Sequence, residues 1–432
     1  MKILFCVEFY YPSIGGAQEV VRQVAERMAE SGHDVTVATS WLPERSGDII
    51  NGVKVVGFKV SGNQVRGLSG EVDVYRAFIR KSDVDVVFFY AAQQWTFDAA
   101  WEALTETRAK KVFVPCGYSG LYNSAYADYF QRLPTILKQL DTVVYHAESY
   151  RDIDFARDHG LTNSIVIPNG AAAEEFAVNP DPEFRSSIGA DQDTQILLTV
   201  GSATGLKGHL ELTRAFALAD FRGREALLII NGNQPHSGGH RPSYYRRFAE
   251  LLHTYGLAYA FRHSVKMLLI AFGWRGGNQN SIEMWVASVN DGRYGRKRVL
   301  RVDLPRPELV QAYLQSNLFV FASNIEYSPL VLYEACAAGL PYLTVPVGNT
   351  AEIVAWTGGG VMCDAPRDSE GYTRAEPKVL ARAIEKLLED PALLSRLGAN
   401  GKAASMARFN WANLTREYEI LFLSLIRGRT QK

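Results

Sequence analysis

Short apolar runs rich in Val, Ile and Phe alternate with segments of helical period along the chain, and this alternation limits the fold more than any other feature. Runs of this length and composition are typical of buried strands. Strands that alternate with helices predict a mostly parallel sheet with helices on both faces, so the expected fold class is α/β. The strand-like runs cover residues 3–9, 35–39, 53–60, 84–90, 111–115, 142–145 and 164–168, and the pattern restarts with residues 196–201, 226–231, 299–302 and 318–322.

The alternation is interrupted between these two sets of strands. Prolines and charges replace the apolar periodicity from Asn179 to Asp193, as is typical of a linker. A chain of 432 residues suits two domains of moderate size. We therefore predict one α/β domain over residues 1–178 and a second of the same kind over residues 192–408. Their helices are expected to include residues 17–31, 209–219 and 307–315, and one that starts at Ser243.

The last segment, residues 409–432, carries an apolar stripe. Large apolar side chains recur there at helical spacing, which predicts a helix with one buried face. Such a helix needs an apolar partner, and either domain could supply it. The residues of the stripe are Trp411, Leu414, Tyr418, Leu421 and Phe422.

Composition excludes several classes of protein. The 46 basic and 46 acidic residues give a formal net charge of zero, which argues against a nucleic-acid partner. The four cysteines lie far apart in apolar stretches without metal or disulfide spacing, which fits a reducing cytoplasm. No apolar run is long enough to span a bilayer. The first residues are best interpreted as a buried strand, because Glu8 interrupts the apolar run of a signal peptide.

Two carboxylates mark the segment from residue 323 to residue 348. A helix is predicted over residues 329–338, with the Ser328 hydroxyl as its cap, Pro329 at its first position and Gly339 at its end. Glu334 is its only charge, and Glu326 lies in the loop before it. A helix N-terminus favours anions, whereas carboxylates accept hydrogen bonds from sugar hydroxyls. The pair therefore indicates a nucleotide-sugar ligand; the alternative is a solvated loop acid and a helix-surface acid.

A glycine pair opens the first predicted helix. Gly15 and Gly16 follow the first strand and would let a ligand approach the backbone amides closely. A simple connection is the alternative. The full GxGxxG pattern is absent from this turn, which argues against a dinucleotide cofactor.

A second glycine-rich turn, VGSATGLKGH, follows the strand at residues 196–201. Lys207 in this turn could neutralise a phosphate lying over the amides, although it could also be a surface lysine. Open α/β sheets bind ligands at the carboxyl ends of their strands, and both Lys207 and Glu326 occupy such positions. These two residues are therefore expected to share one site.

These motifs together resemble the retaining nucleotide-sugar glycosyltransferases of family 4. The similarity covers nearly the whole chain, and Glu326 and Glu334 have the spacing of the family's E-x7-E motif. It rests on GGAQEVVRQVAERMAESGHDVTV near the start, IPNGAAAEEF before the linker, GLKGH in the second domain and EYSPLVLYEACAAGLPYLTVPVGNTAEIV.

The resemblance implies a GT-B fold, in which two Rossmann-like domains face each other across a cleft and the C-terminal helix crosses back to the first domain. It implies that Glu326 contacts donor-sugar hydroxyls, Glu334 the ribose and Lys207 the diphosphate. Amides near Gly16 and Leu330 would face the phosphates or the sugar. The residues assigned to donor binding are Gly15, Gly16, Gly201, Ser202, Lys207, Ser328, Leu330, Val331 and Glu334, and those assigned to catalysis are Glu326, Lys207 and Cys116.

The chain departs from the family pattern at two of these positions. Ser202 stands where the family often has an arginine, so one charge partner of the diphosphate is missing or comes from elsewhere. Cys116 stands where a histidine usually holds the donor sugar or the reacting centre. Tyr118 or Ser119 could fill the space that the shorter side chain leaves.

The expected activity is transfer of a sugar, with retention of configuration, from a nucleoside diphosphate sugar to a saccharide or lipid-linked acceptor in polysaccharide or glycoconjugate synthesis. A UDP-sugar is the favoured donor and a GDP-sugar the alternative. We expect no tightly bound cofactor and no metal, since Lys207 and helix amides can offset the diphosphate charge and no Asp-x-Asp pair suggests otherwise.

Two other functions fit the same residues. One is a nucleotide-sugar epimerase, and the other is a glycosyltransferase-like binding module that has lost catalysis. The expected location is the cytoplasm, with peripheral contact at the inner face of the membrane as an alternative. The basic segments GWRGGNQN and NDGRYGRKR, between residues 273 and 298, could contact an acidic acceptor, but a solvated loop is the favoured interpretation.

Overall fold

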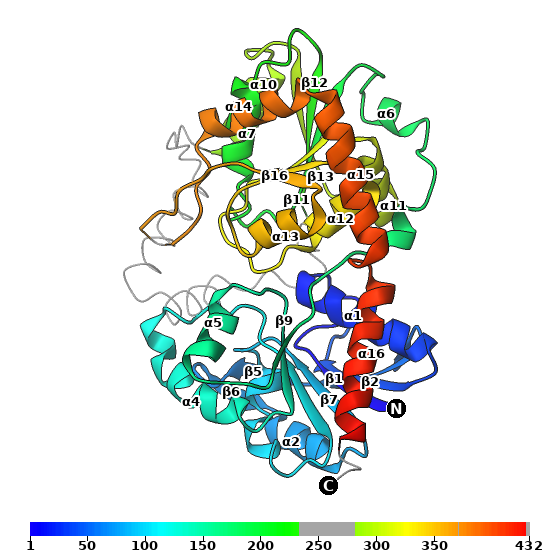
Figure 1. Cartoon of the computed structure of the whole chain (residues 1–432), viewed down its shortest axis with the longest axis vertical. Coiled ribbons are helices and arrows are strands. Elements are labelled where there is room, and N and C mark those ends of the chain that lie inside the picture. Colours follow the sequence, from blue (N-terminus) through cyan, green and yellow to red (C-terminus); the bar gives the residue numbers. More distant parts are fainter. Residues whose placement is uncertain (233–280, 370, 429–432) are drawn as a thin grey trace. The chain divides into compact units, whose positions relative to one another are not determined.

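The computed structural model describes residues 1–232, 281–369 and 371–428, in which the strands form two large sheets and one small one (Figure 1). The first sheet has the order β10-β9-β8-β7-β1-β2-β4-β3, the second β13-β12-β11-β14-β15-β16, and β5 pairs with β6. By contacts, the chain divides into two compact units. The first holds Met1–Pro180, Ile325–Met362 and Asp390–Lys432, and the second holds Asp181–Asn324 and Cys363–Glu389.

The first sheet is parallel except at its edge, where β3 runs antiparallel to β4. Its central strand β1 aligns Ile3 with Val35 on one side and with Val86 on the other. The strands are β1 (Lys2–Cys6), β2 (Asp34–Ser40), β3 (Ile49–Ile50), β4 (Val53–Phe58), β7 (Val86–Tyr90), β8 (Lys110–Val114), β9 (Thr142–Tyr145) and β10 (Ser164–Val166), and the small sheet is β5 (Val60–Asn63) with β6 (Gly67–Gly70).

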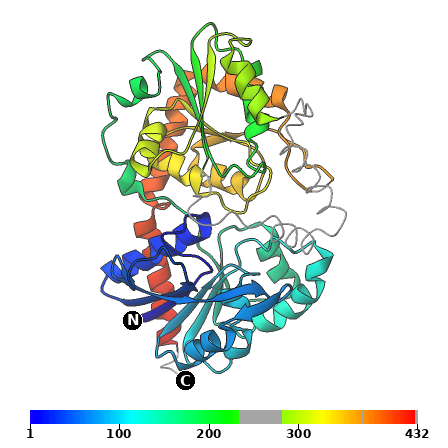
Figure 2. The same cartoon turned by 180° about the vertical axis from the view of Figure 1, so that it is seen from behind.

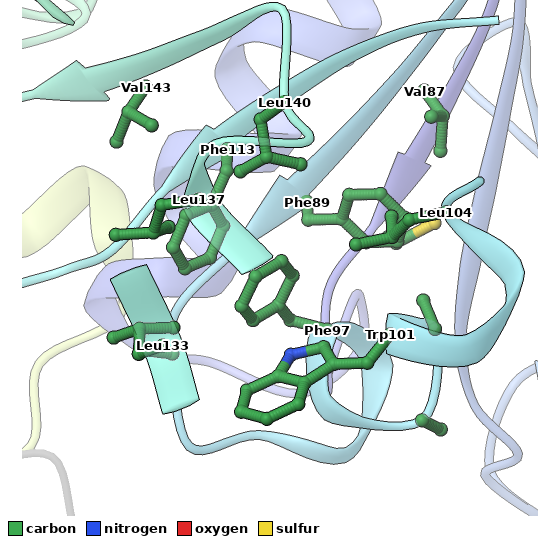
Figure 3. Packing of buried hydrophobic residues seen from close by; sticks show 14 of the residues in the cluster. Val87, Phe89, Phe97, Trp101, Leu104, Phe113, Leu133, Leu137, Leu140 and Val143 are labelled. Carbon is green, nitrogen blue, oxygen red and sulfur yellow. The ribbon is translucent and has the colours of Figure 1, made fainter. Parts of the chain in front are cut away.

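Helices cover both faces of this sheet, as the unbroken apolar strand β7 requires. On one face, α1 (Gly16–Glu30) lies beside α16 (Trp411–Arg427), and both pack on the central strands (Figures 1 and 2). The opposite face carries a second apolar core. Figure 3 shows its centre, where Phe97 stacks on Phe113 with ring centroids 3.8 Å apart. The helices near this core are α2 (Val72–Lys81), α3 (Trp95–Asp98), α4 (Ala127–Leu137) and α5 (Arg151–Asp158).

The first unit also contains the segment that carries the two predicted glutamates. Its elements are α12 (Leu330–Ala338), β15 (Tyr342–Thr344), α13 (Thr350–Thr357), β16 (Gly360–Met362) and α15 (Pro391–Ala407). The packing of α12 against α15 is tight, because a Cβ at Gly398 would lie 2.4 Å from the carbonyl oxygen of Gly339.

The second unit is built around four parallel strands. In it α7 packs on α10 and α14. The strands are β11 (Gln195–Val200), β12 (Ala226–Asn231), β13 (Lys297–Val302) and β14 (Leu318–Phe321), and the helices are α6 (Phe184–Ser187), α7 (His209–Leu218), α10 (Ile282–Asn290), α11 (Arg306–Gln315) and α14 (Pro377–Leu388).

The predicted α/β class is confirmed, but residues 325–362 and 390–408, which the sequence assigned to the second domain, fall in the first unit by contacts. The other differences are local. The strand expected over residues 53–60 is split into β4 and β5, and β1 ends at Cys6 instead of continuing to Phe9. The helix expected to start at Ser243 and the basic segment GWRGGNQN lie outside the described residues.

The second basic segment is engaged in internal contacts. Arg296 pairs with Glu225 at 2.5 Å, and the Lys297 ammonium donates to the carbonyl oxygens of Ala217 and Ala219. Arg298 donates to the carbonyl oxygen of Gly189. Lys297 and Arg298 therefore anchor the start of β13, whereas residues 291–296 form a largely exposed turn, as expected of a solvated loop.

Candidate functional site

The loops at the carboxyl ends of β7 and β8 hold a concentration of unusual backbone. Of the six described non-glycine residues with positive φ, four lie here: Ala91 (70°), Gln93 (62°), Cys116 (61°) and Tyr118 (46°). Such conformations are costly for residues with a Cβ and persist only where the surroundings impose them. Because β7, β8 and β9 are parallel neighbours, their carboxyl ends lie at one edge of the sheet.

His146, directly after β9, occupies the centre of this edge. Its side chain is buried, its Nδ1 lies 2.8 Å from the carbonyl oxygen of Ile167, and its Nε2 lies 3.0 Å from the hydroxyl of Tyr90. Since a carbonyl only accepts, Nδ1 carries the proton and Nε2 accepts from Tyr90. Burial lowers the pKa of His146 to about 4, so the imidazole is neutral. The sequence analysis missed His146, although a histidine immediately after a strand was a visible signal.

The segment that carries Glu326 is fastened to this edge through its backbone. The Tyr150 hydroxyl donates to the carbonyl oxygen of Glu326 at 2.7 Å, and the Asn169 amide donates to that of Ser328 at 3.1 Å. Between them, the Tyr327 hydroxyl accepts from the backbone N–H of His146 at 2.9 Å. Three consecutive residues are thereby fixed, while the Glu326 side chain stays partly exposed. The arrangement presents a carboxylate from a rigid support.

The helix α12 presents the predicted donor residues along one strip. Leu330, Val331 and Glu334 are partly exposed, whereas Leu332, Tyr333, Ala335, Cys336 and Ala337 are buried. Residues three and four apart share a helix face, so the side chains of the strip point the same way.

Ser328 does not cap α12. The cap position is occupied by Pro329, which makes no side-chain cap hydrogen bond. The prediction from the sequence placed the boundary one residue too early, because proline was assigned to the first helical position rather than the one before it. In the first turn of α12 the N–H of Leu332 donates to the carbonyl oxygen of Pro329 at 3.3 Å, and the cap side chain satisfies none of the others.

Cys116 lies near Glu326 and remains a thiol. Burial, together with the charges of Asp152 and Glu326, raises the pKa of Cys116 to about 12. A thiol of this kind is a poor nucleophile and a poor base. It can fill space or donate a weak hydrogen bond at the position where the family usually has histidine.

The two residues that could replace the missing histidine differ in position. Tyr118 is buried, and its ring makes edge contacts with Phe130 and Phe155 in the core. Tyr118 therefore does not fill that space. Ser119 is exposed, and its hydroxyl donates to Gln93 Oε1, which also accepts from the backbone of Gly120.

Gly15 and Gly16 begin α1. Gly15 has extended backbone, with φ 176°, and a Cβ there would meet only the flexible side chain of Gln18. A Cβ at Gly16 would meet nothing within 4 Å. Contacts among the described residues therefore do not demand glycine at position 16, and the open space above it is free for a ligand.

In the second unit, the loop that carries Lys207 is held against the end of β14. The carbonyl oxygen of Leu206 accepts from the backbone of Asn324 at 2.9 Å and from the Ser323 hydroxyl at 3.2 Å. Only glycine fits at position 208, where φ is 66° and a Cβ would lie 1.7 Å from the carbonyl oxygen of Ala322. These contacts explain the GLKGH motif, because they fix the backbone on both sides of Lys207.

Gly201 and Ser202 begin the same loop, and both are partly exposed. A Cβ at Gly201 would lie 3.2 Å from Cγ of Lys207, so a larger residue would crowd the lysine stem. The first residue of α7, His209, is buried, and burial together with the charges of Arg301 and Lys207 lowers its pKa to about 4. His209 is therefore neutral, and the cations that act on it are Arg301 and Lys207.

A hollow of about 560 Å³ lies elsewhere in the first unit, beside α1. Its charged lining is largely paired: Arg22 bonds to Glu19 and Glu26, and Arg27 bonds to Glu174. None of the predicted site residues lines it. It is not the candidate site.

Comparisons with known proteins agree with the geometry of the fold. Residues 14–175 match the family model described as Glycosyltransferase Family 4, and residues 301–404 match that of Glycosyl transferases group 1. The D-inositol 3-phosphate glycosyltransferase of Corynebacterium urealyticum is 22% identical over 441 residues, covering 95% of this chain and 91% of that protein. Glycogen synthase of Mycobacterium tuberculosis is 31% identical over 141 residues, and the match covers 32% of this chain and 32% of that enzyme.

Solved structures share the fold over the full length. Sucrose-phosphate synthase from Thermosynechococcus elongatus superposes with a TM-score of 0.67 at 20% identity, over 99% of both chains. HepE from Anabaena, in complex with UDP, gives a TM-score of 0.66 at 16% identity, over 98% of this chain and 100% of that one. The fold is thus that of a GT-B glycosyltransferase. The chain belongs to the nucleotide-sugar glycosyltransferases of the family 4 type, as the matches in both of its halves show.

Proposed function

We propose that the protein transfers a sugar from a nucleoside diphosphate sugar to a saccharide or lipid-linked acceptor, with retention of configuration. The observation that carries this proposal is the Glu326 segment, in which three consecutive residues are fastened to the first sheet while the carboxylate stays partly exposed. A rigidly held carboxylate beside a helix start without a side-chain cap suits a ligand that is a polyol at one end and an anion at the other.

The donor is proposed to be a UDP-sugar. HepE from Anabaena has been solved with UDP, with UDP and glucose, and with UDP-glucose. In this chain, Glu326 would hold the transferred sugar, Glu334 the ribose and Lys207 the diphosphate. The amides of Gly16 and Leu330, together with Gly15, Gly201, Ser202, Ser328 and Val331, would complete donor binding.

The open first turn of α12 and the open space above Gly16 support this assignment. Both leave room for an anionic ligand to approach backbone amides closely. Cys116 would border the sugar. Its neutral thiol adds no charge there.

The proposed course of reaction is front-side displacement. The bond between the anomeric carbon and the diphosphate oxygen breaks, the acceptor oxygen bonds to that carbon from the same face, and the hydroxyl proton passes to the departing phosphate oxygen. The protonated thiol of Cys116 is a poor nucleophile, which favours a course without a covalent intermediate through that residue. The protein would act by positioning the reactants and stabilising the leaving diphosphate.

The acceptor is proposed to be a saccharide or a lipid-linked molecule. The relatives named above include an enzyme whose name specifies D-inositol 3-phosphate. The chain spans about a third of the length of the glycogen synthases it matches, so those enzymes do not specify its acceptor. In the described part of the chain, none of the helices is both long and apolar enough to cross a bilayer. We place the protein in the cytoplasm, with peripheral contact at the inner face of the membrane as the route to a lipid-linked acceptor.

Acceptor-dependent release of nucleoside diphosphate tests the activity. We expect the purified protein, given UDP-, GDP- or ADP-sugars, to release free diphosphate only when an acceptor is added, and to form a product with the configuration of the donor. An epimerase would change the donor sugar without any acceptor, and a binding module would bind the donor without turnover.

The protein's own metal requirement is tested by adding EDTA, which should leave the rate unchanged. In the described regions, His, Cys, Asp and Glu do not gather in groups of three that could hold a metal ion.

Replacing Lys207 with alanine should weaken nucleoside diphosphate binding more than nucleoside binding, because the ammonium addresses the phosphates. Loss of one charge-assisted contact costs about 1.5 to 3 kcal/mol, roughly a 10- to 100-fold rise in Kd. Calorimetry with the diphosphate and with the nucleoside measures both. Lys386→Ala, which changes an exposed lysine of α14, is the matched control. Equal losses for the two ligands would place Lys207 outside the phosphate site.

A further inference from the structure

Asp152 is a fully buried carboxylate in the first turn of α5. Its Oδ2 accepts from the backbone N–H of Gly117 at 3.0 Å, and its Oδ1 accepts from that of Ile153 at 3.0 Å. The Tyr327 hydroxyl donates a further hydrogen bond to it. A buried carboxylate is expensive to desolvate unless it is hydrogen-bonded, and here all its bonds come from neutral donors.

Two of these donors are sequence neighbours of residues assigned to the proposed sugar site. Gly117 follows Cys116 in the strained turn after β8, and Tyr327 follows Glu326. A Cβ at Gly117 would lie 2.9 Å from Cγ of Tyr327, so the turn and the ring are in direct contact. Asp152 is therefore the group that joins the turn of Cys116 to the segment of Glu326.

Tyr327 is held in place by contacts of its hydroxyl, its carbonyl oxygen and its ring. Its hydroxyl accepts from the backbone of His146, its carbonyl oxygen accepts from Asn349 at 2.8 Å, and its ring centroid lies 5.0 Å from that of Tyr150. Because the Tyr327 hydroxyl accepts from His146, its own proton is free for Asp152. Protonating Asp152, or replacing it with an amide, removes one of the acceptors in this chain of bonds.

The buried position of this carboxylate shifts its pKa. Burial raises the pKa of Asp152 to about 6, and the hydrogen bonds from Tyr327, Gly117 and Ile153 hold it below the value that burial alone would give. The ionisable groups that face it are Cys116 and Tyr118 from the turn after β8, Tyr145 from β9, and Tyr327. All four have pKa values raised by burial and are neutral near pH 7. The charge of Asp152 therefore lacks a cationic partner among these neighbours.

An uncompensated buried charge is retained where it serves function rather than stability. We propose that Asp152 is the positioning residue of the glycosyl-transfer site: its carboxylate couples the Cys116–Tyr118 turn to Tyr327 and so fixes Glu326 for the transferred sugar. This inference rests on the proposed function. Asp152 itself does not contact the substrate.

Asp152→Asn tests the inference, because asparagine keeps the shape and can still accept from Gly117. We expect kcat to fall about 10- to 100-fold, with little change in the Kd of the free nucleoside diphosphate. The kcat of the unmodified protein should fall as the pH is lowered through about 6, since protonation removes an acceptor for Tyr327, and the Asn variant should lack this acid limb. Asp154→Asn, which changes a partly exposed carboxylate of the same helix, should keep both the rate and the limb.

Tyr327→Phe supplies a second variant that removes the hydroxyl and keeps the ring. It should lower kcat to a similar extent, and the double variant should be no slower than the slower single variant, because both changes break the same link. Melting temperatures show whether each variant folds. If Asp152→Asn does not fold, the kcat of Tyr327→Phe and the pH profile of the unmodified protein test the role of Asp152 instead.

The outcomes separate the inference from the function on which it rests. A protein that transfers sugar, but in which Asp152→Asn and Tyr327→Phe behave like Asp154→Asn, overturns the inference alone. An acid limb that persists in Asp152→Asn does the same. A protein that binds no nucleotide sugar by calorimetry overturns both.

Discussion

Replacing Phe422 with alanine is expected to lower the free energy of unfolding of the first unit by about 3 to 5 kcal/mol. The side chain is 0% exposed and packs in the core formed by α1, α16 and the central strands of the first sheet. Its ring lies 6.0 Å from that of Phe88 in β7 and 6.2 Å from that of Tyr418. Truncation leaves a cavity between the sheet and the helix, since neither can move into it without losing other contacts.

Ile420→Ala on the same helix is the matched control. This side chain is 61% exposed, so its truncation should change the stability by less than about 0.5 kcal/mol. Urea unfolding, followed by far-UV circular dichroism, measures both variants. Deleting residues 411–432 should have a larger effect than Phe422→Ala, because Trp411, Leu414 and Tyr418 are also buried. A deletion that left the melting temperature and the activity unchanged would show that α16 is dispensable for the core.

Replacing Glu326 with glutamine should lower kcat roughly 100-fold while leaving the affinity for free nucleoside diphosphate nearly unchanged. That ligand has no sugar for Glu326 to hold. The backbone bonds from Tyr150 and Asn169 do not involve the carboxylate, so the segment should stay in place. An interaction used only in the transition state lowers kcat and kcat/KM equally, which steady-state kinetics can detect.

Glu334→Gln should behave differently. If the carboxylate on the exposed strip of α12 holds the ribose, its loss should weaken free diphosphate and intact donor alike and raise KM. Glu308→Gln, an exposed change in α11, controls for the loss of a negative charge. Calorimetry beside kinetics on the three variants separates the roles. Normal diphosphate binding by Glu334→Gln would refute the ribose assignment and leave Glu334 as a helix-surface acid.

Local pattern alone was enough to predict the α/β class and most of the strands of the two large sheets. Strand and helix positions follow from the spacing of apolar residues. A strand buried on one face has a period of two and a strand buried on both faces is an unbroken apolar run, whereas a helix buried on one face has a period of 3.6. The two sheets therefore appear where the sequence placed them. The glycine turns and the E-x7-E spacing likewise identified the family, since they are local and depend on no distant residue.

The C-terminal helix marks the limit of that reasoning. The stripe of Trp411, Leu414, Tyr418 and Phe422 predicted a buried face but left the partner open. The structure supplies it as the face of the first sheet beside α1. A stripe carries information about how much surface must be buried and none about which distant surface covers it.

In the candidate site, too, the sequence identifies residues whose partners only the folded chain reveals. The sequence identified Glu326, whereas only the folded chain shows that Tyr150, Asn169 and His146 hold its segment in place. Those partners lie between 159 and 181 residues away along the chain. A hydrogen bond over such a separation depends on sheet order and on the length of every intervening loop, which no local pattern encodes.

The protonation states were also decided by tertiary structure. Cys116 and His146 have ordinary pKa values in an unfolded chain, and burial at the sheet edge raises the pKa of Cys116 and lowers that of His146, which keeps both neutral over a wider pH range. The sequence determined which residues are present and which elements they form. The burial of those residues, and therefore their charge and their hydrogen-bond partners, was decided only when the strands of the first sheet brought their carboxyl ends to one edge.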